Sequence, residues 1–179
     1  MKNVGIDSNI LTYFINASDA NYDFTKNNSV LAKEYKAIIQ GYLYVGKPYI
    51  LVPTVSAQYK RISDAKKKKN HETVAYAIFI DGPFNLDSTL IDKRKKVLKN
   101  KHLEGDEDCQ ILAEAELSNL NYLLTCDNDF IKHLSSETNG ISIMKPSSYI
   151  KTLKIIPGQT PKILPDSSNH LYNKTGWKI

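Results

Sequence analysis

One stretch near the N-terminus decides the predicted fold, and it reads Val4-Gly5-Ile6-Asp7-Ser8-Asn9-Ile10-Leu11. A short run of small and apolar residues leads directly into an aspartate, which is typical of a buried strand that ends in a polar turn. Apolar residues then recur at helical spacing as far as Ile15. The stretch therefore predicts a strand, a turn and a helix, with Asp7 at the carboxyl end of the strand.

The same order of strand and helix repeats along the chain. Compact apolar runs predict strands at Lys2–Ile6, Tyr49–Val52, Phe84–Leu86, Tyr122–Thr125 and Ile141–Met144. Helical spacing predicts helices at Ser8–Ile15, Val30–Leu43, Ser88–Lys101, Asp106–Leu117, Asn128–Leu134 and Ser147–Leu153, and one helix from Pro53 to the lysines at 66–69 that continues over Thr73–Ile80. This alternation predicts an α/β fold, in which a parallel sheet is covered by helices on both faces.

The length and composition suit one domain with an extension. The chain has 179 residues, of which 41% are apolar, and this suffices for one sizeable core. We expect the domain to span residues 1–153 and a Pro-containing extension, anchored by Trp177, to span 154–179. No run of about eighteen apolar residues is present, so no membrane span is expected. Cys109 and Cys126 lack the spacing of a zinc site or a disulfide framework, so a cytoplasmic location is expected.

Basic residues are concentrated in one part of the chain. Between Lys60 and His102, twelve Lys or Arg face five acids, so this segment has a larger positive surplus than the +5 of the whole chain. Its two dense runs are Lys66-Lys67-Lys68-Lys69 and Lys93-Arg94-Lys95-Lys96. Such segregation suits a polyanionic partner that meets an acidic pocket. The alternative is that both runs are solvated ends of helices.

Aspartates follow two of the predicted strands. Asp7 follows the first strand, Asp127 follows the strand at Tyr122–Thr125, and Asp108 lies in the first turn of the helix before that strand. Ligands of open parallel sheets bind beyond the carboxyl ends of the strands, where Asp7 and Asp127 converge if their strands are neighbours. Converging carboxylates repel one another unless a cation is present, and Mg²⁺ or Mn²⁺ prefers such oxygen ligands. The pattern indicates an acidic pocket suited to a divalent metal.

Each acid also has a structural interpretation. Asp7 can be an ordinary helix N-cap, because aspartate is among the preferred residues at that position. Asp106, Glu107 and Asp108 can complement the dipole at the start of their helix, and Asp129 can be a solvated acid in a first turn. Spacing alone therefore leaves the metal site open.

Three motifs resemble those of PIN domains, and they occur in the same order. The opening stretch from Val4 to Leu11 resembles the PIN pattern of an apolar strand that runs into Asp-Thr/Ser-Asn. The segment Asp108-x-x-Ile111-Leu112-Ala113-x-Ala115 resembles the third acidic motif, in which an aspartate opens a helix of small residues. A third segment resembles the closing Thr-x-Asp-x-Asp-Phe motif of the family, and it reads Leu123-Leu124-Thr125-Cys126-Asp127-Asn128-Asp129-Phe130.

The resemblance implies a metal-dependent ribonuclease, as in the toxins of bacterial toxin–antitoxin pairs and in RNA-processing enzymes. It implies that Asp7, Asp108 and Asp127 hold Mg²⁺ or Mn²⁺, with Asp129 in support. It further implies that Asn9 and Thr125 orient the ligands or a water molecule. From the residues alone, Thr125 is also an ordinary strand residue and Asn9 an ordinary turn residue. RNA is then the substrate, and an antitoxin protein and a second copy of the chain are partners that the family allows.

One position departs from the PIN pattern. PIN domains usually carry a glutamate five residues beyond a common proline, and counting from Pro53 gives Gln58. A glutamine carbonyl can ligate a hard cation but brings no charge. The resemblance then implies a weaker site, or one served by Glu107 or Asp106. The alternative is that Gln58 is a solvent-facing residue of its helix.

Two further function classes compete with the ribonuclease. A non-catalytic RNA-binding domain with a PIN fold is favoured by Gln58. A phosphoacceptor signalling domain also gathers aspartates at strand ends, but Asp7 has no acidic neighbour and the strand at Thr125 leads to Asp127 rather than to a lysine. The histidines form no metal or nucleophile motif, and most are expected at the surface; they are His71, His102, His133 and His170.

Overall fold

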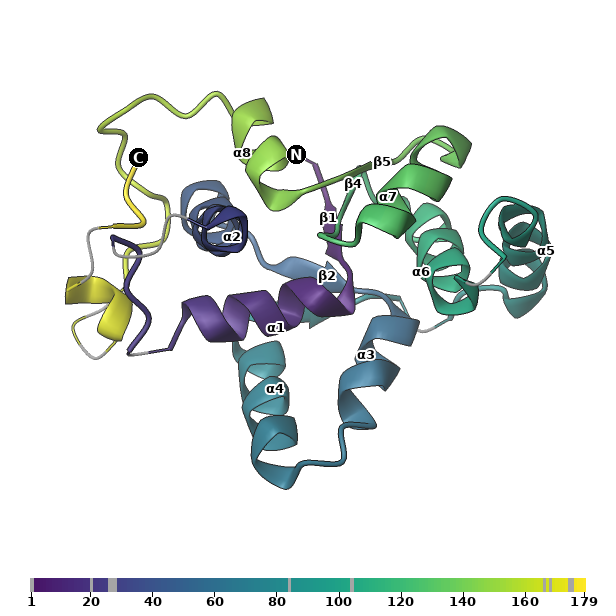
Figure 1. The fold of residues 1–179 in the computed structure, drawn as a ribbon, viewed down its shortest axis with the longest axis horizontal. Coiled ribbons are helices and arrows are strands. Elements are labelled where there is room, and N and C mark those ends of the chain that lie inside the picture. The colour runs from purple at the N-terminus through teal and green to yellow at the C-terminus, as the bar shows by residue number, and fades with distance from the viewer. Residues whose placement is uncertain are drawn as a thin grey trace.

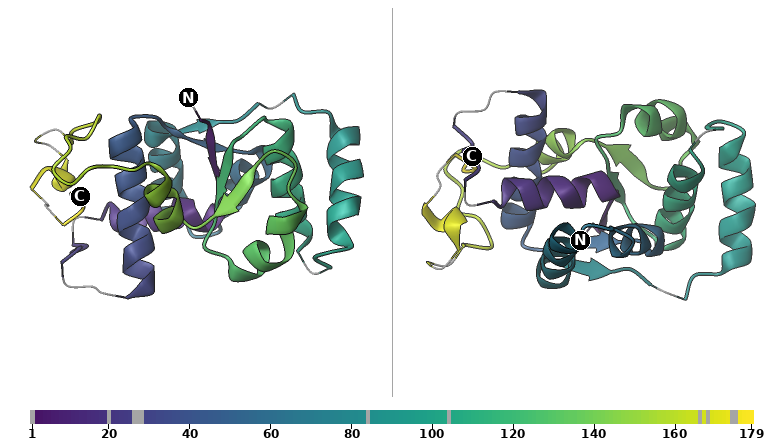
Figure 2. Two further views of the ribbon diagram at one scale, coloured as in Figure 1. Left: turned by 90° about the horizontal axis from the view of Figure 1, so that it is seen from above. Right: turned by 60° about the horizontal axis from the view of Figure 1, so that its bottom comes forward.

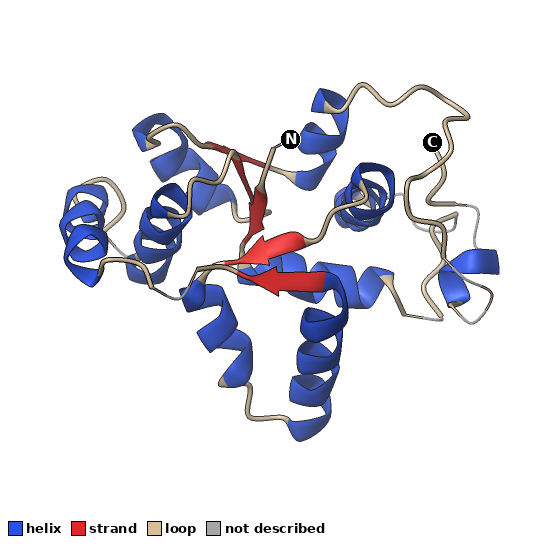
Figure 3. Cartoon of the chain, turned by 180° about the vertical axis from the view of Figure 1, so that it is seen from behind, coloured by secondary structure: helices blue, strands red, loops and turns tan. Residues whose placement is uncertain are grey.

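The computed structural model describes residues 2–19, 21–25, 29–83, 85–103, 105–165, 167, 169–173 and 176–179. Five short parallel strands form one sheet in the order β3-β2-β1-β4-β5. The strands are β1 (Val4–Ile6), β2 (Tyr49–Leu51), β3 (Phe79–Asp81), β4 (Tyr122–Leu124) and β5 (Ser142–Met144). Figure 3 shows them from behind, surrounded by helices.

The two central strands are covered on both faces. All residues of β1 and β4 are buried, as expected for a parallel sheet between two layers of helices. Ile6 pairs with Leu51 on one side and with Leu124 on the other. This register brings the ends of β1, β2 and β4 to the same edge of the sheet.

Helices lie on both sides of the sheet. They are α1 (Ser8–Ala17), α2 (Val30–Val45), α3 (Pro53–Lys60), α4 (Ala65–Ile78), α5 (Ser88–Lys99), α6 (Asp106–Leu117), α7 (Asn128–Leu134) and α8 (Pro146–Thr152), with single turns of 3₁₀ helix at Ser135–Glu137 and His170–Asn173. Figures 1 and 2 show α2 and α8 on one side of the strands, and α6 and α5 on the other. The predicted α/β class, with a parallel sheet flanked by helices, is confirmed.

The prediction of one helix from Pro53 to the lysines is wrong. Helix α3 ends at Lys60, and α4 begins after Asp64. The Asp64 carboxylate accepts a hydrogen bond of 2.6 Å from Lys67 N, so it is a helix N-cap. The cap signal inside this polar stretch separates the two helices.

The third strand also lies elsewhere than predicted. Thr73–Ile80 was expected to be helical throughout, but α4 ends at Ile78 and Phe79–Asp81 forms β3. The reason is pairing with β2, in which Tyr49 lies opposite Phe79, and the two rings stack with centroids 6.0 Å apart. Of the predicted strand Phe84–Leu86, Phe84 lies outside the described residues, and Asn85 and Leu86 are not part of the sheet.

The C-terminal segment is attached to α2. Trp177 is 1% exposed, its carbonyl accepts a hydrogen bond of 2.8 Å from Gln40 Nε2, and its indole donates to Leu171 O. The backbone nitrogen of Ile179 donates to the hydroxyl of Tyr44. Trp177 is therefore the anchor that the sequence predicts. Among the described residues, no helix is long and apolar enough to cross a membrane.

Candidate active site

Asp7 and Asp127 stand at the ends of neighbouring strands. Strand β1 pairs with β4, and Asp7 N continues this pairing with a hydrogen bond of 2.9 Å to Leu124 O. Asp7 is the N-cap of α1, and Asp127 is the N-cap of α7. The predicted convergence of these two positions at one edge of the sheet follows directly from the strand order.

Thr125 and Asn9 join the two acidic positions. The Thr125 hydroxyl donates to Asp7 Oδ2 at 2.8 Å and accepts from Asp127 N at 3.0 Å. Asn9 Nδ2 donates to the same Asp7 oxygen at 2.5 Å, and Asn9 Oδ1 accepts from Cys126 N at 3.2 Å. These contacts fix the orientation of the Asp7 carboxylate relative to the loop that carries Asp127.

The environment of Asp7 disfavours its charge. The side chain is 5% exposed. The pKa of Asp7 is raised to about 6, chiefly by burial and to a smaller extent by the nearby Asp108, although hydrogen bonds from Thr125 and Ser8 act in the opposite direction. In the described part of the chain, no Lys, Arg or His side chain contacts Asp7. A divalent cation bound beside Asp7 would stabilise the charged carboxylate and so lower its pKa.

Asp108 belongs to the same electrostatic group. It lies in the first turn of α6. Burial raises the pKa of Asp108, and the charge of Asp127 raises it further, whereas a hydrogen bond with His102 lowers it. As the side chains lie, however, no three His, Cys, Asp or Glu of the described residues converge on one metal position. Asp129 is exposed in the first turn of α7, and its backbone nitrogen donates to Asp127 Oδ1.

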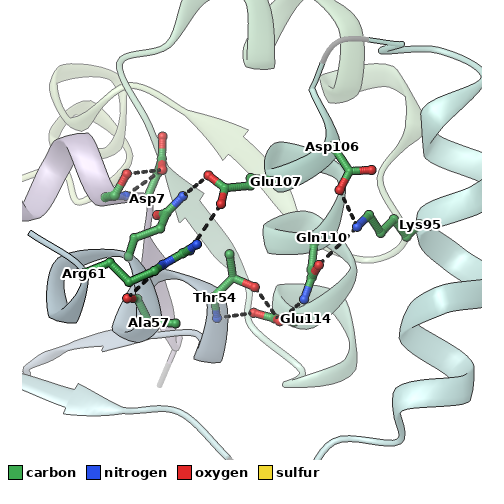
Figure 4. A network of polar contacts seen from close by, with 11 residues as sticks. Asp7, Thr54, Ala57, Arg61, Lys95, Asp106, Glu107, Gln110 and Glu114 are labelled. Carbon is green, nitrogen blue, oxygen red and sulfur yellow. Dashed lines mark hydrogen bonds and ion pairs between the residues drawn. The ribbon is translucent and has the colours of Figure 1, made fainter.

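Gln58 contacts an acid of α6. Its Nε2 donates to Glu107 Oε2 at 2.7 Å, and Arg61 Nη2 lies 3.2 Å from Glu107 Oε1. The other amide atom, Gln58 Oε1, is buried and accepts no hydrogen bond from the described residues. Asp106 instead pairs with Lys95 and Lys99 at 2.6 and 2.7 Å. Figure 4 shows Glu107 on the side of α6 that faces Arg61 and Asp7, and Asp106 on the side that faces Lys95.

The two predicted basic runs lie on different helices that are far apart in Figures 1 and 2. On α4, the exposed residues Lys66 and Lys67 line an open groove of about 400 Å³, together with Thr12 of α1. Lys69 is also exposed, and Lys68 is half-buried, 3.9 Å from Glu72. The groove touches α1 at Thr12, Ile15 and Asn16, more than one helical turn beyond Asp7.

On α5, the four residues of the basic run differ in environment. Arg94 forms hydrogen bonds of 2.7 and 3.0 Å with the Glu116 carboxylate, and Lys95 pairs with Asp106. Their charges are therefore compensated within the fold. Lys93 and Lys96 are exposed and form no ion pair with the described residues. Of the four residues of this run, these two are the ones whose charge is not compensated by a described acid.

Two histidines are not at the surface as expected. His71 is 4% exposed, and its ring joins Thr12 Oγ1 of α1 to Lys67 O of α4. The His102 side chain is 11% exposed and contacts Asp108. No local sequence pattern marks either histidine as buried, because the side-chain partners, Thr12 of α1 and Asp108 of α6, lie on other elements. Burial raises the pKa of the Cys126 thiol to about 12, so this cysteine is not a thiolate nucleophile at neutral pH.

The fold is similar to that of a chain in a solved structure. One match is a chain in the crystal structure of VapBC2 from Rickettsia felis bound to a DNA fragment from its promoter, with a TM-score of 0.50 and 14% sequence identity. The match covers 78% of this chain and 96% of that chain. No family model matches the sequence, and no curated protein matches it. The likeness shows the fold, and it agrees with the predicted PIN-like arrangement.

Proposed function

We propose that the chain is a metal-dependent endoribonuclease of the PIN type. In this proposal Asp7, Asp108 and Asp127 hold Mg²⁺ or Mn²⁺, and Asp129 supports them. One observation carries it: the buried carboxylate of Asp7, with a pKa near 6, lies at the carboxyl edge of the sheet among further acids, and no described cationic side chain contacts it. Perturbed acids at such an edge are typical of functional sites.

The residues at this edge suit a hard divalent cation. The donor atoms are carboxylate oxygens, and Gln58 Oε1, which has no hydrogen-bond partner among the described residues, adds a neutral oxygen near Glu107. Asn9 and Thr125 hold the Asp7 carboxylate in place by hydrogen bonds. In this proposal Glu107 exchanges its contact with Arg61 for the metal and supplies the charge that Gln58 lacks, whereas Asp106 is held by two lysines of α5. A bound metal would supply an activated water and stabilise charge on a phosphate.

Single-stranded RNA is the proposed substrate. The α4 groove with Lys66 and Lys67 runs beside α1, and Lys93 and Lys96 are exposed on the helix next to α6. Because the matched structure is a VapBC2 complex on promoter DNA, we also propose that the chain acts as the toxin of a toxin–antitoxin pair. Its partners are then an antitoxin protein and a second copy of the chain.

A second candidate function is RNA binding without catalysis. It is favoured by Gln58, which replaces an acid, and by the contact of Arg61 with Glu107, which already compensates one carboxylate. In that case the basic helices bind RNA, and the acids at the sheet edge have a structural role.

The test is cleavage of a labelled single-stranded RNA in Mn²⁺. Asp127→Asn should lower the rate by more than the roughly 10–100-fold that is typical for loss of an outer partner of a metal site. Asp92→Asn, at an exposed position of α5, is the matched control and should cleave like the parent. RNA binding without cleavage by the parent would favour the second candidate, and equal cleavage by Asp127→Asn would remove Asp127 from the site.

A further inference from the structure

His102 lies in the connection between α5 and α6, and both its backbone N–H and its backbone carbonyl form hydrogen bonds. Its nitrogen donates to Leu98 O at 3.2 Å, and its carbonyl accepts from Gly105 N at 3.2 Å. The side chain then turns toward α6, where His102 Nε2 lies 2.9 Å from Asp108 Oδ2. Both side chains are largely shielded from water, at 11% and 25% exposure.

Two further contacts fix the imidazole ring. It stacks on the His133 ring of α7, with centroids 5.0 Å apart and planes inclined by 7°. Gly105 also lies against the ring, because an added Cβ at this residue would be 1.8 Å from His102 Cδ2. Gly105 has an ordinary negative φ of −92°, so the reason for glycine here is space for the ring. The contact with α7 links His102 to the helix that Asp127 caps.

The hydrogen bond from His102 makes the two carboxylate oxygens of Asp108 different from each other. An ionised carboxylate only accepts hydrogen bonds, so the shared proton is carried by His102 Nε2. One lone pair of Asp108 Oδ2 is thereby engaged, whereas Oδ1 accepts no hydrogen bond from the described residues and is the freer oxygen for a metal. Partners that orient a ligand in this way typically change metal affinity by about 10–100-fold.

From these contacts we infer that His102 is a positioning residue, which holds Asp108 as a ligand that offers one oxygen to the metal. His133 and Gly105 keep its ring in place. The inference rests on the proposed function, because it assumes a metal at the acidic edge. A purely structural alternative is that the His102–Asp108 contact stabilises the start of α6 and has no effect on metal binding.

The test measures Mn²⁺ affinity by calorimetry for the parent and three variants. His102→Phe keeps a flat ring beside His133 but removes the donor, and it should weaken Mn²⁺ binding by about 10–100-fold. His102→Gln restores an N–H donor of similar reach and should recover part of the affinity. Gly105→Ala leaves both side chains intact but displaces the ring, so it should also weaken binding.

Melting temperatures without metal separate the two explanations. A structural role predicts that the variants melt earlier but bind Mn²⁺ like the parent, and this result would overturn the inference while the proposed function stands. Equal losses of affinity for His102→Phe and His102→Gln would also overturn it, because the donor would then be irrelevant. If the parent itself binds no Mn²⁺, the proposed function fails, and the inference fails with it.

Discussion

At the scale of the residue, the buried carboxyl group of Asp7 couples stability to pH. Its pKa of about 6 in the folded protein lies above the ordinary value of 3.8. The folded state therefore binds this proton more tightly than the unfolded state does. The contribution to stability is fully present below about pH 4 and is lost as the pH rises through about 6, by roughly 3 kcal/mol.

This dependence gives the first prediction. Without metal, the free energy of unfolding of the parent should fall between pH 4 and pH 7 relative to that of Asp7→Asn, which lacks the titrating group. Denaturant titrations of both proteins at several pH values measure the difference. Addition of Mn²⁺ at pH 7 should stabilise the parent and not the variant. A difference between the two proteins that is independent of pH would contradict the electrostatic description of Asp7.

The second prediction concerns Gln58 and Glu107, which are joined by a hydrogen bond of 2.7 Å. Gln58→Glu places two carboxylates in contact, so the metal-free protein should melt earlier, and Mn²⁺ affinity should rise by about tenfold, equivalent to about 1.4 kcal/mol. Glu107→Gln removes a charge and should lower the affinity.

The double variant Gln58→Glu with Glu107→Gln exchanges the two groups and serves as the matched control. It should bind Mn²⁺ about as tightly as the parent, because the number of charges is unchanged. If none of the three variants alters metal affinity, this pair of residues lies outside the site.

At the scale of the element, sequence patterns predict what is local and miss what depends on packing. The helical period of α6 and the apolar run of β4 need no other part of the chain. Strand β3 was missed because Phe79–Asp81 continues a helical pattern, and only pairing with β2 makes it a strand. The break between α3 and α4 was missed because the cap at Asp64 lies within a polar stretch.

Helix α5 carries the third prediction. Its exposed residues Lys93 and Lys96 are unpaired among the described residues, whereas Arg94 is held by Glu116. Replacing both lysines by alanine should weaken RNA binding for all sequences. It should also lower the slope of log affinity against log salt by about 0.7 for each lost phosphate contact on a single strand.

The matched control for this experiment is Lys151→Ala, an exposed lysine of α8 on another part of the molecule. Its slope should equal that of the parent. The same measurement with Lys66 and Lys67 replaced tests the α4 groove separately. An unchanged slope for either pair would mean that those lysines are solvated ends of their helix.

At the scale of the whole molecule, strand order explains why part of the site could be predicted. Asp7 and Asp127 follow strands that the motifs indicate, and a parallel sheet must bring such positions to one edge. The sequence left open whether Glu107 or Asp106 lies beside Gln58, and it gave no sign that His102 contacts Asp108 and His133, because these contacts join different elements of the fold. The compensation of Arg94 and Lys95 likewise depends on how α5 packs against α6.

The most direct test of the central claim is anomalous diffraction from crystals soaked in Mn²⁺. We expect a manganese peak at the carboxyl edge of the sheet, in contact with Asp7 and Asp127, with Asp108 turned toward it. Crystals of Asp7→Asn soaked in the same way should lack the peak. A parent crystal with no manganese at this edge, or with manganese bound only elsewhere, would contradict the account.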